Sequence, residues 1–183
     1  MKSLSVILGL ATVFLCKEFN AAQPFTFTNS ETAVQDTESD IKLIREQYQK
    51  INSLKLQAQK FSYETKSCVE GGEITYYSFQ GKIVKVTEKG AMNDAVWKKE
   101  YYYKDGKVFF CLENLQWGSA AGPTKTTVYR FYIKNGKSIR EMSDQKIEDL
   151  KEKASENIAL ADALLKVKNS RNFSSVYDRF CDK

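Results

Sequence analysis

The chain has no histidine, only two prolines, nine glycines and four cysteines among its 183 residues. Without histidine there can be no Ser-His-Asp or Cys-His nucleophile system, no histidine general base and no histidine metal ligand. The sequence also lacks a phosphate-binding glycine loop, a calcium-binding loop and a nucleotide fingerprint. We therefore expect no cofactor and no metal site, and we expect a binding function rather than catalysis.

The sequence also lacks an apolar segment long enough to span a bilayer. The run Leu4–Cys16 has 13 residues, whereas a transmembrane helix needs roughly 20. Lys2 precedes this run and Ala22 ends the polar stretch after it, which is the layout of a secretory signal peptide. We expect residues 1–22 to be a signal peptide and the protein to be exported, either periplasmic or secreted, with no transmembrane segment in the mature chain.

The net charge is only mildly positive. Loss of residues 1–22 removes two lysines and one glutamate, so that +5 becomes +4. A charge of this size favours solubility and weak attraction to anionic surfaces, but it does not by itself indicate nucleic-acid binding. We expect a monomer whose partner is a protein, a glycan or a lipid, and no nucleic-acid partner.

The same cleavage also changes the number of cysteines, because it removes Cys16. Anchoring of a lipoprotein at Cys16 is less favoured, because the bulky Leu15 precedes it. Three cysteines remain, and in an oxidising compartment they predict one disulfide and one free thiol. Among the three pairings we favour Cys68–Cys181, which would fasten the tail to the start of the sheet. A nucleophilic Cys111 is the alternative, although it would need lysine or a helix terminus to lower its pKa.

Two segments have helical periodicity. Residues 39–60 carry apolar side chains at spacings of three and four, and residues 143–169 do the same, with Ser143 as a plausible N-cap. Residues 23–38 are polar and predict a flexible lead-in. The tail from Asn169 to Lys183 carries aromatic residues and is expected to pack back on the domain.

Between the helices the period changes to two, and one pattern occurs three times. Tyr77, Tyr102 and Tyr132 each stand four residues before a Gly-Lys pair. Asp-Gly and Asn-Gly favour two-residue hairpins, because a type I′ turn needs positive φ at both central residues. The six expected strands are 72–79, 82–88, 95–103, 107–113, 126–134 and 137–142. The predicted fold class is α+β, a single domain over 39–183 with an N-terminal helix, a six-stranded antiparallel meander and a C-terminal helix packed on the sheet. We expect both helices on one face of the sheet.

These hairpins resemble a known group of sequences. The matching residues are Glu70 to Tyr77, Tyr101 to Phe109 and Phe131 to Arg140, preceded by Cys68. They are similar to strands of the form Tyr-Tyr-Phe-x-Asn-Gly-Lys-Leu in small, uncharacterised exported proteins of bacteria. The resemblance covers about residues 70–142. It implies an exported protein with this fold and carries no activity with it.

Aromatic residues fall on both predicted faces of the sheet, which is typical of covered faces or of an aromatic surface for a partner. The loop Asn114–Lys125 adds a tryptophan among small residues. The candidate binding residues are Trp117, Tyr101, Tyr103, Lys99, Arg130 and Tyr132.

We expect an exported, non-enzymatic binding module that uses the aromatic and basic sheet face and the Trp117 loop. One alternative is an inhibitor of a secreted enzyme, with this loop as a plug. The other is a hydrolase that uses Cys111 or paired carboxylates. The candidate pairs are Glu70 with Glu73 and Glu100 with Glu113.

Overall fold

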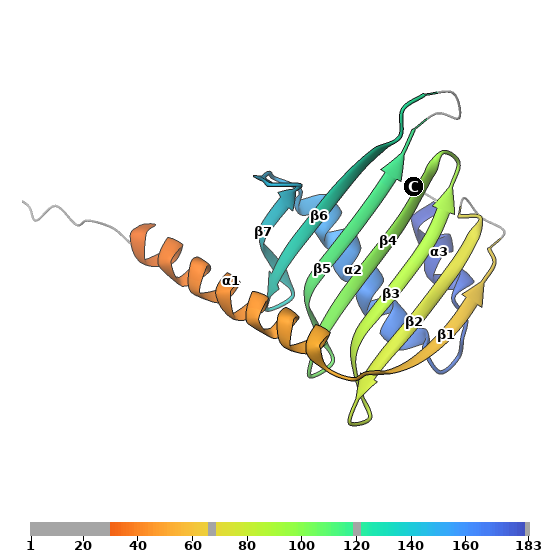
Figure 1. Ribbon diagram of the computed structural model, residues 1–183, viewed down its shortest axis with the longest axis horizontal. Helices are drawn as coiled ribbons and strands as arrows, with labels where there is room; N and C mark the ends of the chain where they lie inside the picture. Colours follow the sequence, from red (N-terminus) through yellow and green to blue (C-terminus); the bar gives the residue numbers. More distant parts are fainter. Residues whose placement is uncertain (1–29, 66–68, 119–121, 182–183) are drawn as a thin grey trace, which may run out of the picture.

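The computed structural model describes residues 30–65, 69–118 and 122–181, and the side chains of 36–65, 69–118 and 122–177. Helix α1 (Ser30–Ser53) precedes the strands, and helices α2 (Lys151–Val167) and α3 (Ser174–Cys181) follow them (Figure 1). The strands are β1 (Gln57–Tyr63), β2 (Gly71–Phe79), β3 (Lys82–Met92), β4 (Ala95–Lys104), β5 (Lys107–Trp117), β6 (Lys125–Lys134), β7 (Lys137–Ser143) and β8 (Lys146–Ile147).

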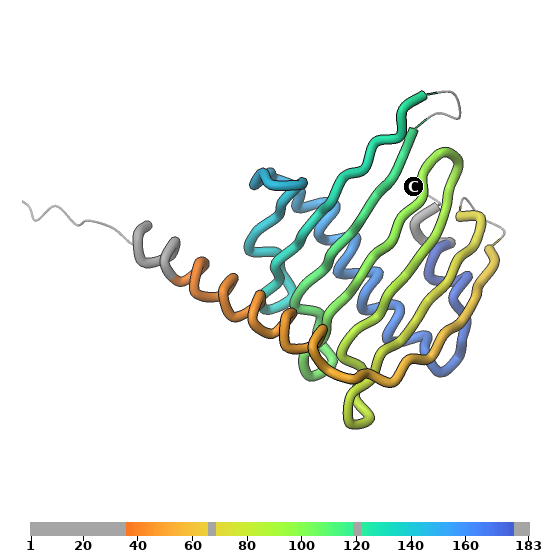
Figure 2. Tube along the Cα trace, in the orientation of Figure 1, coloured from red at the N-terminus to blue at the C-terminus, as the bar shows by residue number. Residues whose placement is uncertain are grey.

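The strands form one antiparallel sheet in which each strand pairs with the next along the chain (Figure 2). The α+β class and the antiparallel sheet are confirmed, but the expected number of six strands is wrong, because β1 and β8 extend the sheet to eight. The predicted helix 39–60 begins earlier, at Ser30, so the expectation of a flexible lead-in is wrong for residues 30–38. The helix also ends earlier than predicted, at Ser53. Ser53 and Asn52 donate side-chain hydrogen bonds back to Lys50 O and Tyr48 O. The next residues pair with β2, from Gln57 opposite Ser78, so the sheet takes up backbone groups that the helix would have used.

The three predicted hairpins are confirmed. Their central residues, Gln80–Gly81, Asp105–Gly106 and Asn135–Gly136, all have positive φ, between 50° and 77°, as a type I′ turn requires. Each hairpin also shifts register directly after the repeated tyrosine. This bulge leaves one extra residue in the return strand. The three extra residues, Val84, Phe109 and Ile139, pack toward helix α1.

Helices cover both faces of the sheet, so the expectation of both helices on one face is wrong. Ile41, Ile44 and Ile51 of α1 pack on Tyr102 and its neighbours. Helices α2 and α3 pack on the opposite face, where the larger core lies. In Figure 1, α1 crosses in front of one end of the strands and α2 runs behind them. The two-sided cover explains why neither face of the predicted sheet is purely polar.

The C-terminal part begins later than predicted. Helix α2 starts at Lys151 rather than after Ser143, because Ser143 still belongs to β7. Asp144 then forms a turn: its N–H donates to Val128 O at 2.7 Å, and its Oδ1 accepts from the Val128 N–H at 2.9 Å. The expected packing of the tail is confirmed, since Phe173, Val176 and Tyr177 are buried against the sheet.

Candidate functional site

Two of the predicted binding residues lie in the core. Tyr101 and Tyr103 are fully buried on the face covered by α2 and α3. The Tyr103 hydroxyl donates to Ala161 O of α2 at 2.9 Å, and burial raises the pKa of both tyrosines. Neither side chain is available to a ligand.

The other sheet candidates are divided between the two faces. Tyr132 is buried beneath α1, where its hydroxyl accepts a hydrogen bond from Arg45 Nε at 3.3 Å. Arg130 lies on the same side and donates to the backbone carbonyl of Asp144 at 2.5 Å. Lys99 lies on the opposite side, 5.6 Å from the ring centroid of Trp97. The expectation of one continuous aromatic and basic surface is therefore not met.

Trp117 is the exposed member of the predicted set. It ends β5 rather than sitting in a loop, and 47% of its surface is exposed. The Lys125 ammonium, directly opposite on β6, lies 5.4 Å from the ring centroid. Residues 119–121 of the predicted loop lie outside the described residues, and the inhibitor hypothesis stays a prediction.

The structure tests only part of the predictions about the cysteines. Cys111 is free and buried, and burial raises its pKa, which is the opposite of what a nucleophile needs. The side chains of Cys68 and Cys181 lie outside the described residues, so the favoured pairing stays a prediction.

The paired carboxylates do not converge on a cleft. Glu100 stands opposite Leu112, one residue from Glu113, so the two carboxylates project from opposite faces of the sheet. Glu73 is held by Lys60 at 2.6 Å and by Lys89 at 3.7 Å. The structure gives no support to acid–base chemistry by these pairs.

Beyond the end of the sheet that α1 covers, no other described helix lies over the same side of the sheet (Figure 1). We call this surface the open face. It consists of three cross-strand rows, Gly71-Ala91-Val96-Gln116-Thr126, Glu73-Lys89-Lys98-Asn114-Val128 and Lys60-Thr75-Thr87-Glu100-Leu112-Arg130. The residues of the first two rows, except Val128, line a groove of about 500 Å³.

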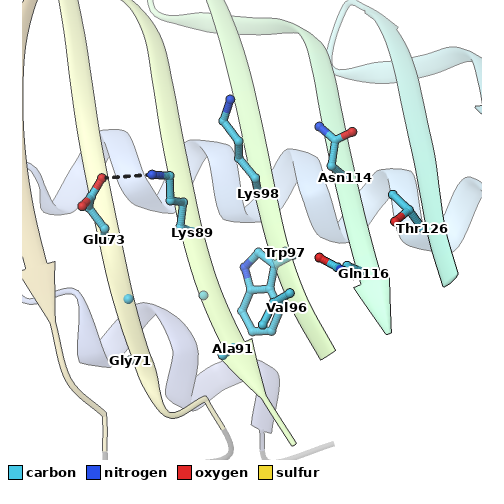
Figure 3. Close-up of a pocket in the computed structure, with 12 residues that line it drawn as sticks. Gly71, Glu73, Lys89, Ala91, Val96, Trp97, Lys98, Asn114, Gln116 and Thr126 are labelled. Carbon is cyan, nitrogen blue, oxygen red and sulfur yellow. Dashed lines mark ion pairs between the residues drawn. The ribbon is translucent and has the colours of Figure 1, made fainter. Parts of the chain in front are cut away.

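The groove is a depression in the sheet surface because Gly71, Gly72, Gly90 and Ala91, which line it, have small side chains or none. Figure 3 labels the polar side chains of Lys98, Asn114 and Gln116 among those that line the groove. On the opposite face, Gly90 leaves room for the indole of Trp97, since a Cβ atom at Gly90 would lie 2.4 Å from Trp97 Cζ2. The indole therefore packs flat against β3.

Lys89 and Lys98 are direct cross-strand neighbours on the open face, and their side chains are 57% and 47% exposed. Like charges placed directly opposite each other destabilise a sheet. Lys89 lies 3.7 Å from Glu73, and Lys98 lies 2.6 Å from Glu100. Hydrogen bonds from Lys60, followed by the charges of Lys60 and Lys89, lower the pKa of Glu73.

Glu100 anchors the third row. Burial alone would raise its pKa, but hydrogen bonds from Lys85, Lys98 and Tyr102 outweigh burial and lower the pKa to about 2. The distances are 2.6 Å to each lysine and 2.6 Å to the tyrosine hydroxyl. The carboxylate therefore stays charged at neutral pH and fixes the two lysines at the edge of the open face.

The sequence did not predict this groove, because the predicted strands 82–88 and 107–113 are too short. Lys89–Asp94 and Asn114–Lys125 were interpreted as links between hairpins. The structure extends β3 to Met92 and β5 to Trp117. Alternation of side chains along these longer strands then brings Lys89, Lys98 and Asn114 to one face. The alternation Lys98-x-Glu100 was the sequence signal that could have indicated that Lys98 and Glu100 share a face of the sheet.

No family model, curated protein or solved structure matches this chain. The resemblance to exported bacterial proteins stays a prediction. Among the described residues, no helix is long and apolar enough to cross a membrane. The same residues contain no group of three or more cysteine, aspartate or glutamate side chains arranged to hold a metal ion.

Proposed function

We propose that the protein is a non-enzymatic binding module whose open face binds an anionic polysaccharide. The observation that carries this proposal is the pair of exposed lysines, Lys89 and Lys98, held side by side on the groove. The open face has four cationic side chains and two carboxylates, namely Lys60, Lys89, Lys98 and Arg130 with Glu73 and Glu100. The excess of positive charge favours an anionic ligand.

The polar groups beside the lysines favour a glycan over a polypeptide. Asn114, Gln116 and Thr126 offer amide and hydroxyl groups, which can hydrogen-bond to sugar hydroxyls and carboxylates. The backbone groups of β2 to β6 are already paired with neighbouring strands, so an extended peptide cannot add itself to the sheet here, as it can at an edge. Recognition at this face must use side chains, which suits a chain of uronic acids.

The test is binding of polygalacturonate to the full chain, measured by calorimetry at low and at physiological salt. Lys89→Gln is expected to weaken binding roughly threefold to tenfold, because it removes one cation from the groove, and added salt is expected to weaken binding by the wild type. Lys137→Gln is the matched control, since Lys137 is exposed beside a turn, outside the open face. It makes the same change of charge and is expected to leave binding unchanged.

Other ligands serve as the opposing outcomes. Neutral dextran is expected not to bind. Tighter binding of polyglutamate or of vesicles containing phosphatidylglycerol would replace the polysaccharide with an acidic protein or a lipid surface. Equal effects of Lys89→Gln and Lys137→Gln would show that net charge, and not the groove, attracts the polymer, and the proposal would then be wrong.

A further inference from the structure

A second cavity lies on the opposite face of the sheet, between strands β3 to β5 and helices α2 and α3. Its volume is about 320 Å³, at the lower end of the range for small-molecule sites. The side chains of Met92, Ala95 and Leu115 are only partly buried, so solvent reaches the cavity at this end. It shares Trp97 with the groove of the open face but no other lining residue.

One wall of the cavity is polar, and most of its polar groups have hydrogen-bond partners. The Glu88 carboxylate is fully buried and accepts hydrogen bonds from Trp97 Nε1 at 2.7 Å and from the hydroxyls of Tyr63 and Tyr101 at 3.4 and 3.5 Å. Glu113 is bonded to Lys153 Nζ at 2.9 Å. These contacts offset the cost of burying two carboxylates.

One buried polar atom in the lining of this cavity, Asn157 Oδ1, has no hydrogen-bond partner in the described part of the chain. Asn157 is only 3% exposed. An unpaired buried polar atom is unfavourable and calls for a partner.

The orientation of the Asn157 amide is fixed by its neighbours. Its Nδ2 donates to Glu113 Oε2 at 3.2 Å and to Lys153 O at 3.0 Å. Both partners are acceptors, so a flipped amide would lose both bonds. The free atom is therefore the acceptor Oδ1, and the missing partner must be a donor.

The remaining walls define the rest of the ligand. Val69, Met92, Ala95, Leu115 and Leu160 give the cavity an apolar lining. Lys99 also lines it and disfavours a cation, whereas Glu88 and Glu113 disfavour an anion. A neutral molecule avoids both penalties.

We propose that this cavity is a ligand site for a small, neutral, apolar molecule. The molecule has one hydrogen-bond donor, and Asn157 Oδ1 accepts the hydrogen bond from it. The site lies on the side of the sheet opposite the open face, and its ligand differs in charge and in size from the polysaccharide. The protein thus has two binding surfaces, one on each side of the sheet.

The test compares two fluorescent probes on the full chain. N-phenyl-1-naphthylamine has aromatic rings and one N–H donor, whereas 1-phenylnaphthalene has the rings without the donor. The first probe is expected to bind the wild type about fivefold or more tightly than the second, because only the first satisfies Asn157 Oδ1. In Asn157→Leu this difference is expected to vanish while 1-phenylnaphthalene still binds.

A second variant narrows the cavity without touching the polar wall. Ala95→Leu is expected to weaken binding of both probes, with an unfolding midpoint close to that of the wild type. Leu43→Ser is the control for nonspecific adsorption, since Leu43 of α1 is 59% exposed and far from the cavity in the fold. Absence of binding, equal affinity of the wild type for the two probes, or dependence on Leu43 in place of Ala95 would each overturn the proposal.

Discussion

Trp97 Nε1 donates a hydrogen bond of 2.7 Å to Glu88 Oε1 across strands β3 and β4. The indole reaches this position because Gly90, directly opposite Trp97, has no side chain. Glu88 has no exposed surface, and its carboxylate depends on Trp97, Tyr63 and Tyr101 for hydrogen bonds. Trp97 lies between the groove of the open face and the cavity on the opposite face, since it is a lining residue of both.

The Trp97–Glu88 bond predicts a stability difference between the two tryptophans. Trp97→Phe removes the shortest of the three hydrogen bonds to the Glu88 carboxylate and is expected to lower the free energy of unfolding by about 1–3 kcal/mol. Trp117→Phe is the matched control, because Trp117 is 47% exposed and its main contact is with the Lys125 ammonium. Its effect is expected to stay below about 1 kcal/mol. Urea unfolding at pH 7 measures both, and an equal loss in the two variants would contradict the assigned role of the bond.

Glu100 predicts the pH dependence of stability. Its pKa falls from an ordinary value of 4.5 to about 2 on folding, so the charged form is favoured in the folded state. The resulting stabilisation is fully present above about pH 5 and is lost as the pH falls toward 2, with a size of about 3 kcal/mol. Glu100→Gln is expected to remove most of it at pH 7 and to unfold at nearly the wild-type urea concentration near pH 2.

Glu73→Gln is the control for this titration. Glu73 also pairs with lysines, but its side chain is 27% exposed and its partners are exposed surface lysines, so solvent screens the interaction. Its substitution is expected to change stability much less at every pH. A wild-type curve that stays parallel to that of Glu100→Gln between pH 5 and 2 would contradict the predicted role of Glu100.

Cys111 predicts a thiol that does not react in the folded protein. It is buried in the core beneath α2, and burial raises its pKa, so almost no thiolate forms at pH 8. Iodoacetamide is expected to leave the peptide that contains Cys111 unlabelled in the native chain and to label it in urea, as read by mass spectrometry. Rapid labelling of Cys111 in the native chain would revive the hypothesis of a cysteine nucleophile.

The repeated tyrosine motif shows how far the sequence could predict the fold. Tyr77, Tyr102 and Tyr132 fall in one cross-strand row, because Lys85 and Phe110 link them through the register. A bulge follows each of them and turns an extra apolar residue toward α1. The sequence repeat is therefore the platform on which α1 packs. The motif was visible in the sequence, but its role in packing against α1 could be recognised only from the position of the helix in the structure.

The candidate site could be predicted only in part. A binding surface on the sheet stays a prediction, but Tyr101, Tyr103 and Tyr132 are buried. The sequence did not indicate that Lys89 is the direct cross-strand neighbour of Lys98. Alternation along a strand indicates which residues share a face, but it does not indicate which face a distant helix covers.

The sequence by itself determined the three hairpins, since positive φ at Gly81, Gly106 and Gly136 and at the residue before each is a local requirement that Gln-Gly, Asp-Gly and Asn-Gly satisfy. It also determined the exclusion of histidine chemistry, which depends on composition alone. Only the tertiary structure decided which tyrosines are buried, where the helix before β1 ends and which lysines meet. These features depend on contacts between residues far apart in the chain, such as Tyr103 with Ala161 and Glu113 with Asn157. Helix packing on both faces fixes those contacts, and no local pattern encodes it.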